Sequence, residues 1–101
     1  MRSVLVVDDD EATRASLVDL VRAEGCEARG AGSLGEAREL LRDDRPSLVL
    51  LDLVLPDGSG IAFIQELDGD GRPAVVLMTG HASLDTSIDA LRLGATDYLV
   101  K

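Results

Sequence analysis

The chain has 101 residues, of which 19 are acidic and 10 are basic, so its formal charge is −9 at neutral pH. A chain of this length builds one hydrophobic core and therefore one domain. The acidic balance disfavours a nucleic acid or an anionic membrane surface as a direct partner, and it favours a site that attracts cations. Cys26 is the only cysteine, which excludes an intrachain disulfide and a thiolate metal cluster.

The core must be aliphatic, because 46% of the residues are apolar but only Phe63 and Tyr98 are aromatic. Such a core suits a parallel sheet covered by helices. The N-terminal segment MRSVLVVDDD has too short an apolar run for a signal peptide or a membrane span. We therefore expect a cytoplasmic protein without a membrane segment, in which Cys26 is a small buried thiol.

The first half of the chain alternates short apolar runs with amphipathic stretches, which predicts repeated strand-helix units. Gly25 is placed to end the first helix, and Ser33 and Glu36 form a capping box that begins the second. The first helix carries an apolar stripe of Thr13, Leu17, Leu20 and Val21. In chain order, the predicted elements are a strand over 4–7, a helix over 11–24, a strand over 26–29, a helix from 33 and a strand over 47–51.

The second half continues the alternation. Residues 68–72 resemble the start of a calcium loop, but no glutamate closes a twelve-residue loop, so we interpret them as a solvated turn. In chain order, the predicted elements are a loop over 53–60, a short helix over 61–67, a strand over 74–79, a helix around 84–91 that Gly94 ends, and a strand over 97–100. The pattern predicts an α/β fold with five strands and four helices, in which a helix after the fifth strand is missing.

Polar residues of types that bind metal ions or take part in reactions lie where the predicted strands end. Parallel strands joined by helical crossovers bring these ends to one edge of the sheet. The residues at this edge are Asp8 and Asp9 after the first strand, Asp52 after the third, Thr79 after the fourth and Lys101 after the fifth. Because the strands between them are almost purely apolar, we expect these polar groups to form a functional site.

The acidic residues of this edge also have structural interpretations. Asp10 and Glu11 fit a helix N-cap and its first turn, but one cap does not require Asp8 and Asp9 as well. Asp52 has the alternative of capping the following turn. Three carboxylates brought together repel one another unless a cation is present. The sequence therefore favours a metal site.

Oxygen ligands without clustered histidines favour Mg²⁺, with Asp9 and Asp52 as direct ligands and Asp8 as a ligand through water. With the ion bound, Asp52 can act as a nucleophile toward a phosphoryl group. Lys101 would supply a second cation and Thr79 a hydrogen bond, although a solvated lysine and a turn hydroxyl are the plain alternatives. We interpret the single histidine, His81, as solvent-exposed and not catalytic.

Four segments, VVDDD, LLDLVLPDGSG, MTGHA and DYLVK, together resemble the response-regulator receiver domains of two-component signalling. The resemblance covers the whole chain and implies a doubly wound, flavodoxin-like parallel sheet with strand order 2-1-3-4-5. It implies that Asp8 and Asp9 form an acidic pocket for Mg²⁺ and that Asp52 accepts a phosphoryl group from a histidine kinase. It further implies that the backbone carbonyl of Val54 binds the metal and that Thr79 and Lys101 fill the hydroxyl and lysine roles.

The resemblance also implies how phosphorylation is transmitted. Thr79 moves toward the phosphoryl group and Tyr98 turns inward, and the face formed by the fourth helix and fifth strand can support a homodimer. The stretch from Thr79 to Lys101 looks particularly like the receivers of transcription activators that contain an ATPase domain. Such receivers continue into a fifth helix after the lysine, so we expect residues 1–101 to be a receiver domain truncated after strand five.

Two other functions compete with a phosphorylation switch. Asp8-Asp9-Asp10 after the first strand suggests an aspartate-nucleophile phosphohydrolase of the haloacid dehalogenase kind, but that motif wants Thr or Val where this chain has Ala12. A phosphorylation-independent interaction module is disfavoured by the intact acidic set. We therefore expect no enzyme in the ordinary sense, but a receiver that assists its own phosphorylation and dephosphorylation and regulates an output domain.

Overall fold

The computed structural model describes residues 2–43, 45–52, 54–67, 72–79 and 97–100. Five parallel strands form one sheet in the spatial order β2-β1-β3-β6-β7, which confirms the predicted order 2-1-3-4-5. The strands are β1 (Ser3–Val7), β2 (Glu27–Ala31), β3 (Leu48–Asp52), β6 (Ala74–Thr79) and β7 (Asp97–Val100). The described helices are α1 (Glu11–Ala23), α2 (Leu34–Asp43) and α3 (Gly60–Glu66). The predicted helix around 84–91, the turn at 68–71, His81 and Lys101 lie outside the described residues.

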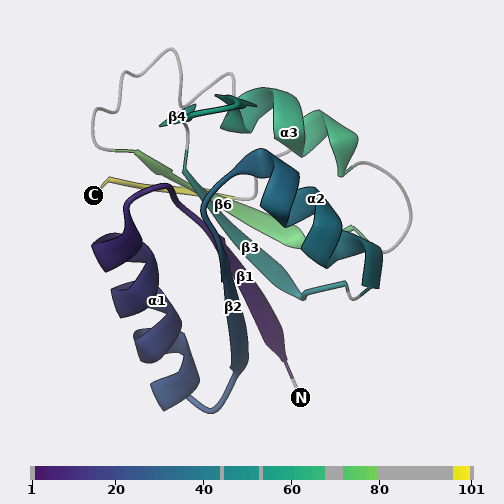
Figure 1. The fold of residues 1–101 in the computed structure, drawn as a ribbon. Helices are drawn as coiled ribbons and strands as arrows, with labels where there is room; N and C mark the ends of the chain where they lie inside the picture. The colour runs from purple at the N-terminus through teal and green to yellow at the C-terminus, as the bar shows by residue number, and fades with distance from the viewer. Residues whose placement is uncertain (1, 44, 53, 68–71, 80–96, 101) are drawn as a thin grey trace.

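Helices cover the sheet on both sides, with α1 on one face and α2 and α3 on the other (Figure 1). Side chains of a strand alternate between the two faces. Every second residue of the central strands points toward α2 and α3, where the main core forms. The strand residues of this core are Leu5, Val7, Ala31, Val49, Leu51, Val75 and Leu77. The helices, the loop before α3 and the residue that follows α3 add Leu34, Ala37, Leu55, Phe63, Ile64 and Leu67.

The first helix ends where the sequence predicts, at a left-handed glycine. Gly25 has φ 88° and follows Glu24, the C-cap residue. The N–H of Gly25 donates to Arg22 O at 3.0 Å, and the N–H of Cys26 donates to Val21 O at 3.4 Å. This pair of bonds is a Schellman motif, for which glycine is preferred because it adopts positive φ without a steric penalty.

The predicted apolar stripe of α1 is wrong at one position. Thr13, Leu17 and Val21 are half-buried, but Leu20 is 65% exposed. Half-buried positions of this helix also include Arg14 and Val18, so the covered face is centred between these residues and lies about a quarter turn from Leu20. The helical periodicity of apolar residues placed Leu20 in the predicted stripe because Leu20 lies at its margin.

The second helix is capped from two directions. Ser33 Oγ accepts the N–H of Glu36 at 3.2 Å, which confirms one half of the capping box, whereas the Glu36 carboxylate accepts the N–H of Gly32. The loop before α3 contains an antiparallel hairpin of β4 (Val54–Leu55) and β5 (Gly58–Ser59), which the sequence suggested only as a turn.

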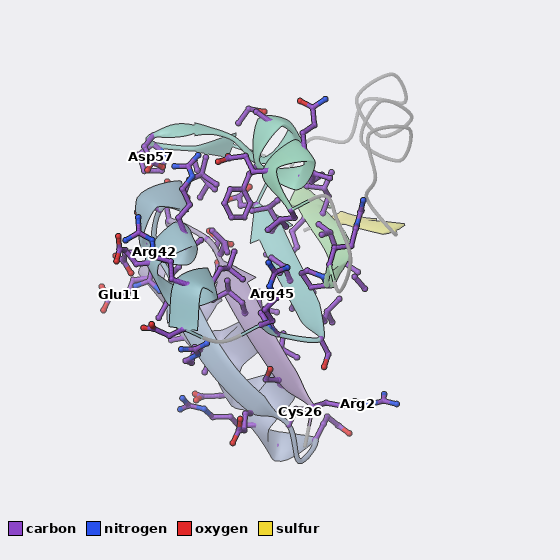
Figure 2. All side chains as sticks on the ribbon, turned by 90° about the vertical axis from the view of Figure 1, so that its right-hand side faces the viewer. Arg2, Glu11, Cys26, Arg42, Arg45 and Asp57 are labelled. Atoms are coloured by element: carbon purple, nitrogen blue, oxygen red, sulfur yellow. The ribbon has the colours of Figure 1, made fainter. Side chains whose placement is uncertain are left out.

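Asp57 lies at the tip of this hairpin, next to the start of α2 (Figure 2). Its two carboxylate oxygens accept the N–H groups of Leu34 at 2.9 Å and Gly35 at 3.0 Å. The first N–H groups of a helix have no partner within the helix and carry partial positive charge, so a carboxylate satisfies them well. Asp57 thus joins the loop that follows β3 to the first turn of α2.

These bonds make the stability of the domain depend on pH. The N–H groups of Leu34 and then Gly35 hold the pKa of Asp57 below its ordinary value of 3.8. The stabilisation is complete above that ordinary pKa and is lost as the pH falls through the lowered pKa of the folded state. We expect Asp57→Asn to unfold at lower urea concentration than wild type at pH 7, and the difference to shrink as the pH drops below about 4. A difference that stays constant in acid would contradict this assignment.

Candidate functional site

Strand pairing brings two of the predicted acidic residues to neighbouring positions. Val7 at the end of β1 pairs with Leu51 of β3, so the next residues, Asp8 and Asp52, lie side by side at the carboxyl edge of the sheet. Asp9 follows in the turn toward α1. One carboxylate oxygen from each of the three residues lies within 4.8 Å of the other two. The predicted acidic cluster is therefore present in the fold.

The cluster is buried on one side and open on the other. Asp8 is fully buried and Asp52 is 8% exposed, whereas Asp9 is exposed. Asp8 and Asp52 are the buried charged residues among those described. A buried carboxylate needs compensating hydrogen bonds or a cation, because removal from water is costly for a charge. The open side, at Asp9, leaves the site accessible to small ions and to a substrate.

Asp8 is held through its side chain and through both backbone groups. Its N–H donates to Ala31 O of β2 at 3.0 Å, and its Oδ1 accepts the N–H of Asp10 at 3.0 Å. Its backbone carbonyl accepts a hydrogen bond from Arg14 Nη1 of α1 at 2.9 Å. Sequence reasoning did not identify Arg14, whose partner is a backbone atom of another element.

The expected capping role of Asp10 is correct in position but not in its bond. Asp10 occupies the N-cap of α1 with extended backbone angles, yet its side chain makes no capping hydrogen bond. Its carboxylate instead accepts the hydroxyl of Thr13. The first turn of α1 therefore begins at the predicted residue, while the Asp10 side chain bonds to a side chain of that turn instead of to its backbone.

The remaining predicted site residues are placed only through their backbones. Thr79 ends β6 and pairs with Val100 of β7. Tyr98 pairs with Leu77, further from the edge. Val54 begins β4, two residues after Asp52. Topology thus places Thr79 at the carboxyl edge with the acidic cluster, while Lys101 lies outside the described residues.

The acidic cluster fits a hard divalent cation. Its donor atoms are carboxylate oxygens, which Mg²⁺ and Ca²⁺ prefer. Three like charges this close repel one another, and the repulsion is strong where burial lowers the effective dielectric constant. A cation between Asp8, Asp9 and Asp52 would remove this repulsion, and the open side at Asp9 leaves room for metal-bound water.

Surface hollows elsewhere do not compete with this site. One of about 520 Å³ lies between α2 and α3 and is lined by residues that include Arg42 and Arg45, both visible in Figure 2. Another of about 470 Å³ lies near Cys26 and Arg22. Neither contains Asp8, Asp9 or Asp52. The helices of the described part of the chain lack the length and apolar character that a membrane crossing needs.

Comparisons with known proteins agree with this geometry. A family model for the response regulator receiver domain matches residues 4–101. The regulatory protein AtoC of Escherichia coli is 35% identical over 99 residues, which are 97% of this chain and 22% of AtoC. The chain spans between 22% and 55% of the length of the curated relatives it matches first.

Two solved structures show the same fold over all of this chain. One is the solution structure of the beryllofluoride-activated NtrC4 receiver domain dimer, with a TM-score of 0.93, 35% identity and 84% of that chain covered. The other is a response regulator from Burkholderia pseudomallei with a phosphorylated aspartic acid, a calcium ion and citrate. It has a TM-score of 0.92 and 29% identity, and 60% of that chain is covered.

Proposed function

Because this chain belongs to the response regulator receiver domains, we propose that its phosphoryl acceptor is Asp52 and that Mg²⁺ binds beside it. Receiver domains are the phosphoacceptor switches of two-component signalling and regulate output domains. The observation that carries the assignment is the cluster of Asp8, Asp9 and Asp52, with carboxylate oxygens within 4.8 Å of one another. Asp52 stands at the end of the central strand β3, at the carboxyl edge of the sheet.

The proposed metal ligands are the carboxylates of Asp9 and Asp52, the carboxylate of Asp8 through water, and the backbone carbonyl of Val54. When bound, Mg²⁺ neutralises negative charge on the carboxylates and on the oxygens of the transferring phosphoryl group. The calcium ion and phosphorylated aspartic acid of the Burkholderia structure support this pairing of a divalent ion with an acyl phosphate.

The chemistry at Asp52 is a nucleophilic displacement. A carboxylate oxygen of Asp52 forms a bond to phosphorus, and the bond from phosphorus to the donor nitrogen of a phosphohistidine breaks. The histidine leaves with the bonding electron pair and takes up a proton, and Asp52 becomes an acyl phosphate. The Thr79 hydroxyl would then donate a hydrogen bond to a phosphoryl oxygen, and the Lys101 ammonium would pair with its negative charge. Hydrolysis of the acyl phosphate, assisted by the residues at this edge of the sheet, returns the domain to its unphosphorylated state.

The assignment of Asp52 as the phosphoryl acceptor also suggests how phosphorylation changes the conformation of the domain. Movement of Thr79 toward the phosphoryl group would leave space for Tyr98 of β7 to turn inward, which shifts the domain between two conformations.

The phosphoryl donor would be a sensor histidine kinase in the cytoplasm, and the output would be a regulator of transcription. The NtrC4 receiver domain is a dimer, which supports a homodimer for this chain. The interface that we propose for it is the face next to β7. The acidic surface does not favour direct contact of this domain with nucleic acid.

Phosphorylation by a small molecule tests the proposal without the kinase. We expect acetyl phosphate with Mg²⁺ to give one base-labile phosphoryl adduct per chain, detected by intact mass spectrometry and mapped to the peptide that contains Asp52. Chelation of Mg²⁺ should prevent the adduct, because charge repulsion at the cluster is then uncompensated. An adduct on Asp8 with rapid turnover would instead indicate a phosphohydrolase, and no adduct with any donor would indicate an interaction module.

A further inference from the structure

Arg14 connects helix α1 to the acidic cluster. It belongs to the first turns of α1, where its N–H donates to Asp10 O at 2.9 Å. Its side chain crosses the end of β2, and Nη1 donates to the backbone carbonyl of Asp8 at 2.9 Å. This carbonyl belongs to the peptide unit that joins Asp8 to Asp9. A bond at this position therefore fixes the orientation of the backbone that carries both carboxylates.

Two glycines of β2 and its following bend make room for Arg14. A Cβ atom on Gly30 would lie 2.9 Å from Cγ and 3.0 Å from Cδ of Arg14. A Cβ atom on Gly32 would lie 3.0 Å from Nη1. Neither glycine is among those with positive φ, so the backbone itself does not require glycine at these positions. Glycine within a strand often marks close approach of another group, and here that group is the arginine side chain.

A second arginine of α1 makes a comparable bond away from the cluster. Arg22 Nη2 donates to the backbone carbonyl of Ala28 in β2 at 2.8 Å. Both arginines therefore attach α1 to a backbone oxygen of the sheet region, Arg22 to one in β2 and Arg14 to that of the residue after β1. The difference lies in the acceptor, because only the Arg14 bond ends on the peptide unit between two residues of the acidic cluster.

We propose that Arg14, seated over Gly30 and Gly32, is a positioning residue for the metal site. This inference rests on the proposed role of Asp8 and Asp9 as ligands of Mg²⁺. Arg14 holds the Asp8–Asp9 peptide against the end of β2, and the N–H of Asp8 bonds to Ala31 O on the same strand. The two bonds prevent the turn from rotating, so the carboxylates keep the spacing that one cation can bridge.

Four variants test the inference, with Mg²⁺ affinity measured by calorimetry. We expect Arg14→Ala to weaken Mg²⁺ binding by roughly tenfold or more, as the loss of groups that orient metal ligands commonly does. The matched control Arg22→Ala should bind Mg²⁺ like wild type, although it loses a bond of the same kind. Gly30→Ala should weaken binding by displacing Arg14, and this effect should disappear when Gly30→Ala is combined with Arg14→Ala.

A second measurement separates this inference from the proposed function. The amide NMR signals of Asp8 to Asp10 in metal-free protein should shift more in Arg14→Ala than in Arg22→Ala. If wild type binds Mg²⁺ and Arg14→Ala binds it equally well, the inference is wrong and the proposed function stands. Equal losses in Arg14→Ala and Arg22→Ala would show a general structural effect and would also overturn it. If wild type does not bind Mg²⁺, the proposed function fails, and unshifted amide signals in Arg14→Ala would remove the positioning role as well.

Discussion

Asp52→Asn is expected to abolish phosphoryl adduct formation by acetyl phosphate while the chain stays folded. The amide keeps the size of the carboxylate in a position that is only 8% exposed, but its oxygen carries no negative charge and is a poor nucleophile. Intact mass spectrometry with Mg²⁺ measures the result. In metal-free buffer the variant should melt at or above the temperature of wild type, because one of three neighbouring negative charges is gone.

Asp57→Asn is the matched control for this loss. Asp57 belongs to the loop that follows the same strand, but its carboxylate is exposed and bonds to the start of α2. We expect this variant to form the adduct as wild type does. A stoichiometric adduct on Asp52→Asn would move the acceptor to another residue of the cluster, with Asp8 and Asp9 as the candidates for peptide mapping.

Phe63→Ala should produce the largest loss of stability among single substitutions in the core. Phe63 is 1% exposed and packs from α3 into the cluster of aliphatic side chains beneath it. Truncation of a buried phenylalanine to alanine commonly costs about 3–5 kcal/mol, from lost apolar burial and from the cavity left behind. This is a large part of the roughly 5–15 kcal/mol that stabilises a typical domain. The Arg38 guanidinium, 5.6 Å from the ring centre, would lose its aromatic partner as well.

Urea unfolding followed by circular dichroism measures this change. The matched control is Leu20→Ala, because Leu20 is 65% exposed on α1 and its truncation should change the free energy of unfolding by less than about 0.5 kcal/mol. A loss below about 1.5 kcal/mol for Phe63→Ala would mean that the neighbouring side chains collapse into the space, and that Phe63 does not anchor α3.

The sheet and the acidic cluster were predictable because both depend on local signals. Strands β1 and β3 are continuous apolar runs, and such runs indicate strands covered on both faces. Parallel strands then place the residues after β1 and β3 at one edge of the sheet. Asp8, Asp9 and Asp52 meet there because β1 and β3 are neighbours in the sheet. The family resemblance added the strand order, which the structure confirms.

Side chains that bond to the backbone of a distant element were not predictable in the same way. Asp57 caps α2 from a position more than twenty residues away in the chain, and no periodicity signals such a bond. Hairpin β4–β5 escaped prediction because strands of two residues are too short to show alternation. Arg14 had one readable signal, the glycines at 30 and 32, which suggest that another group lies close to the end of β2.

Strand β2 forms one outer edge of the sheet, and its backbone is partly closed to further pairing. Its residues Glu27 and Ala31 bond toward β1, so the alternate residues Ala28 and Gly30 turn their backbone groups outward. Unpaired groups on an edge strand invite association with a strand of another molecule. Arg22 already occupies the Ala28 carbonyl, so a strand added here would have to displace that guanidinium. Helix α1, which packs on the sheet, thereby also hinders the addition of a strand from another molecule at β2.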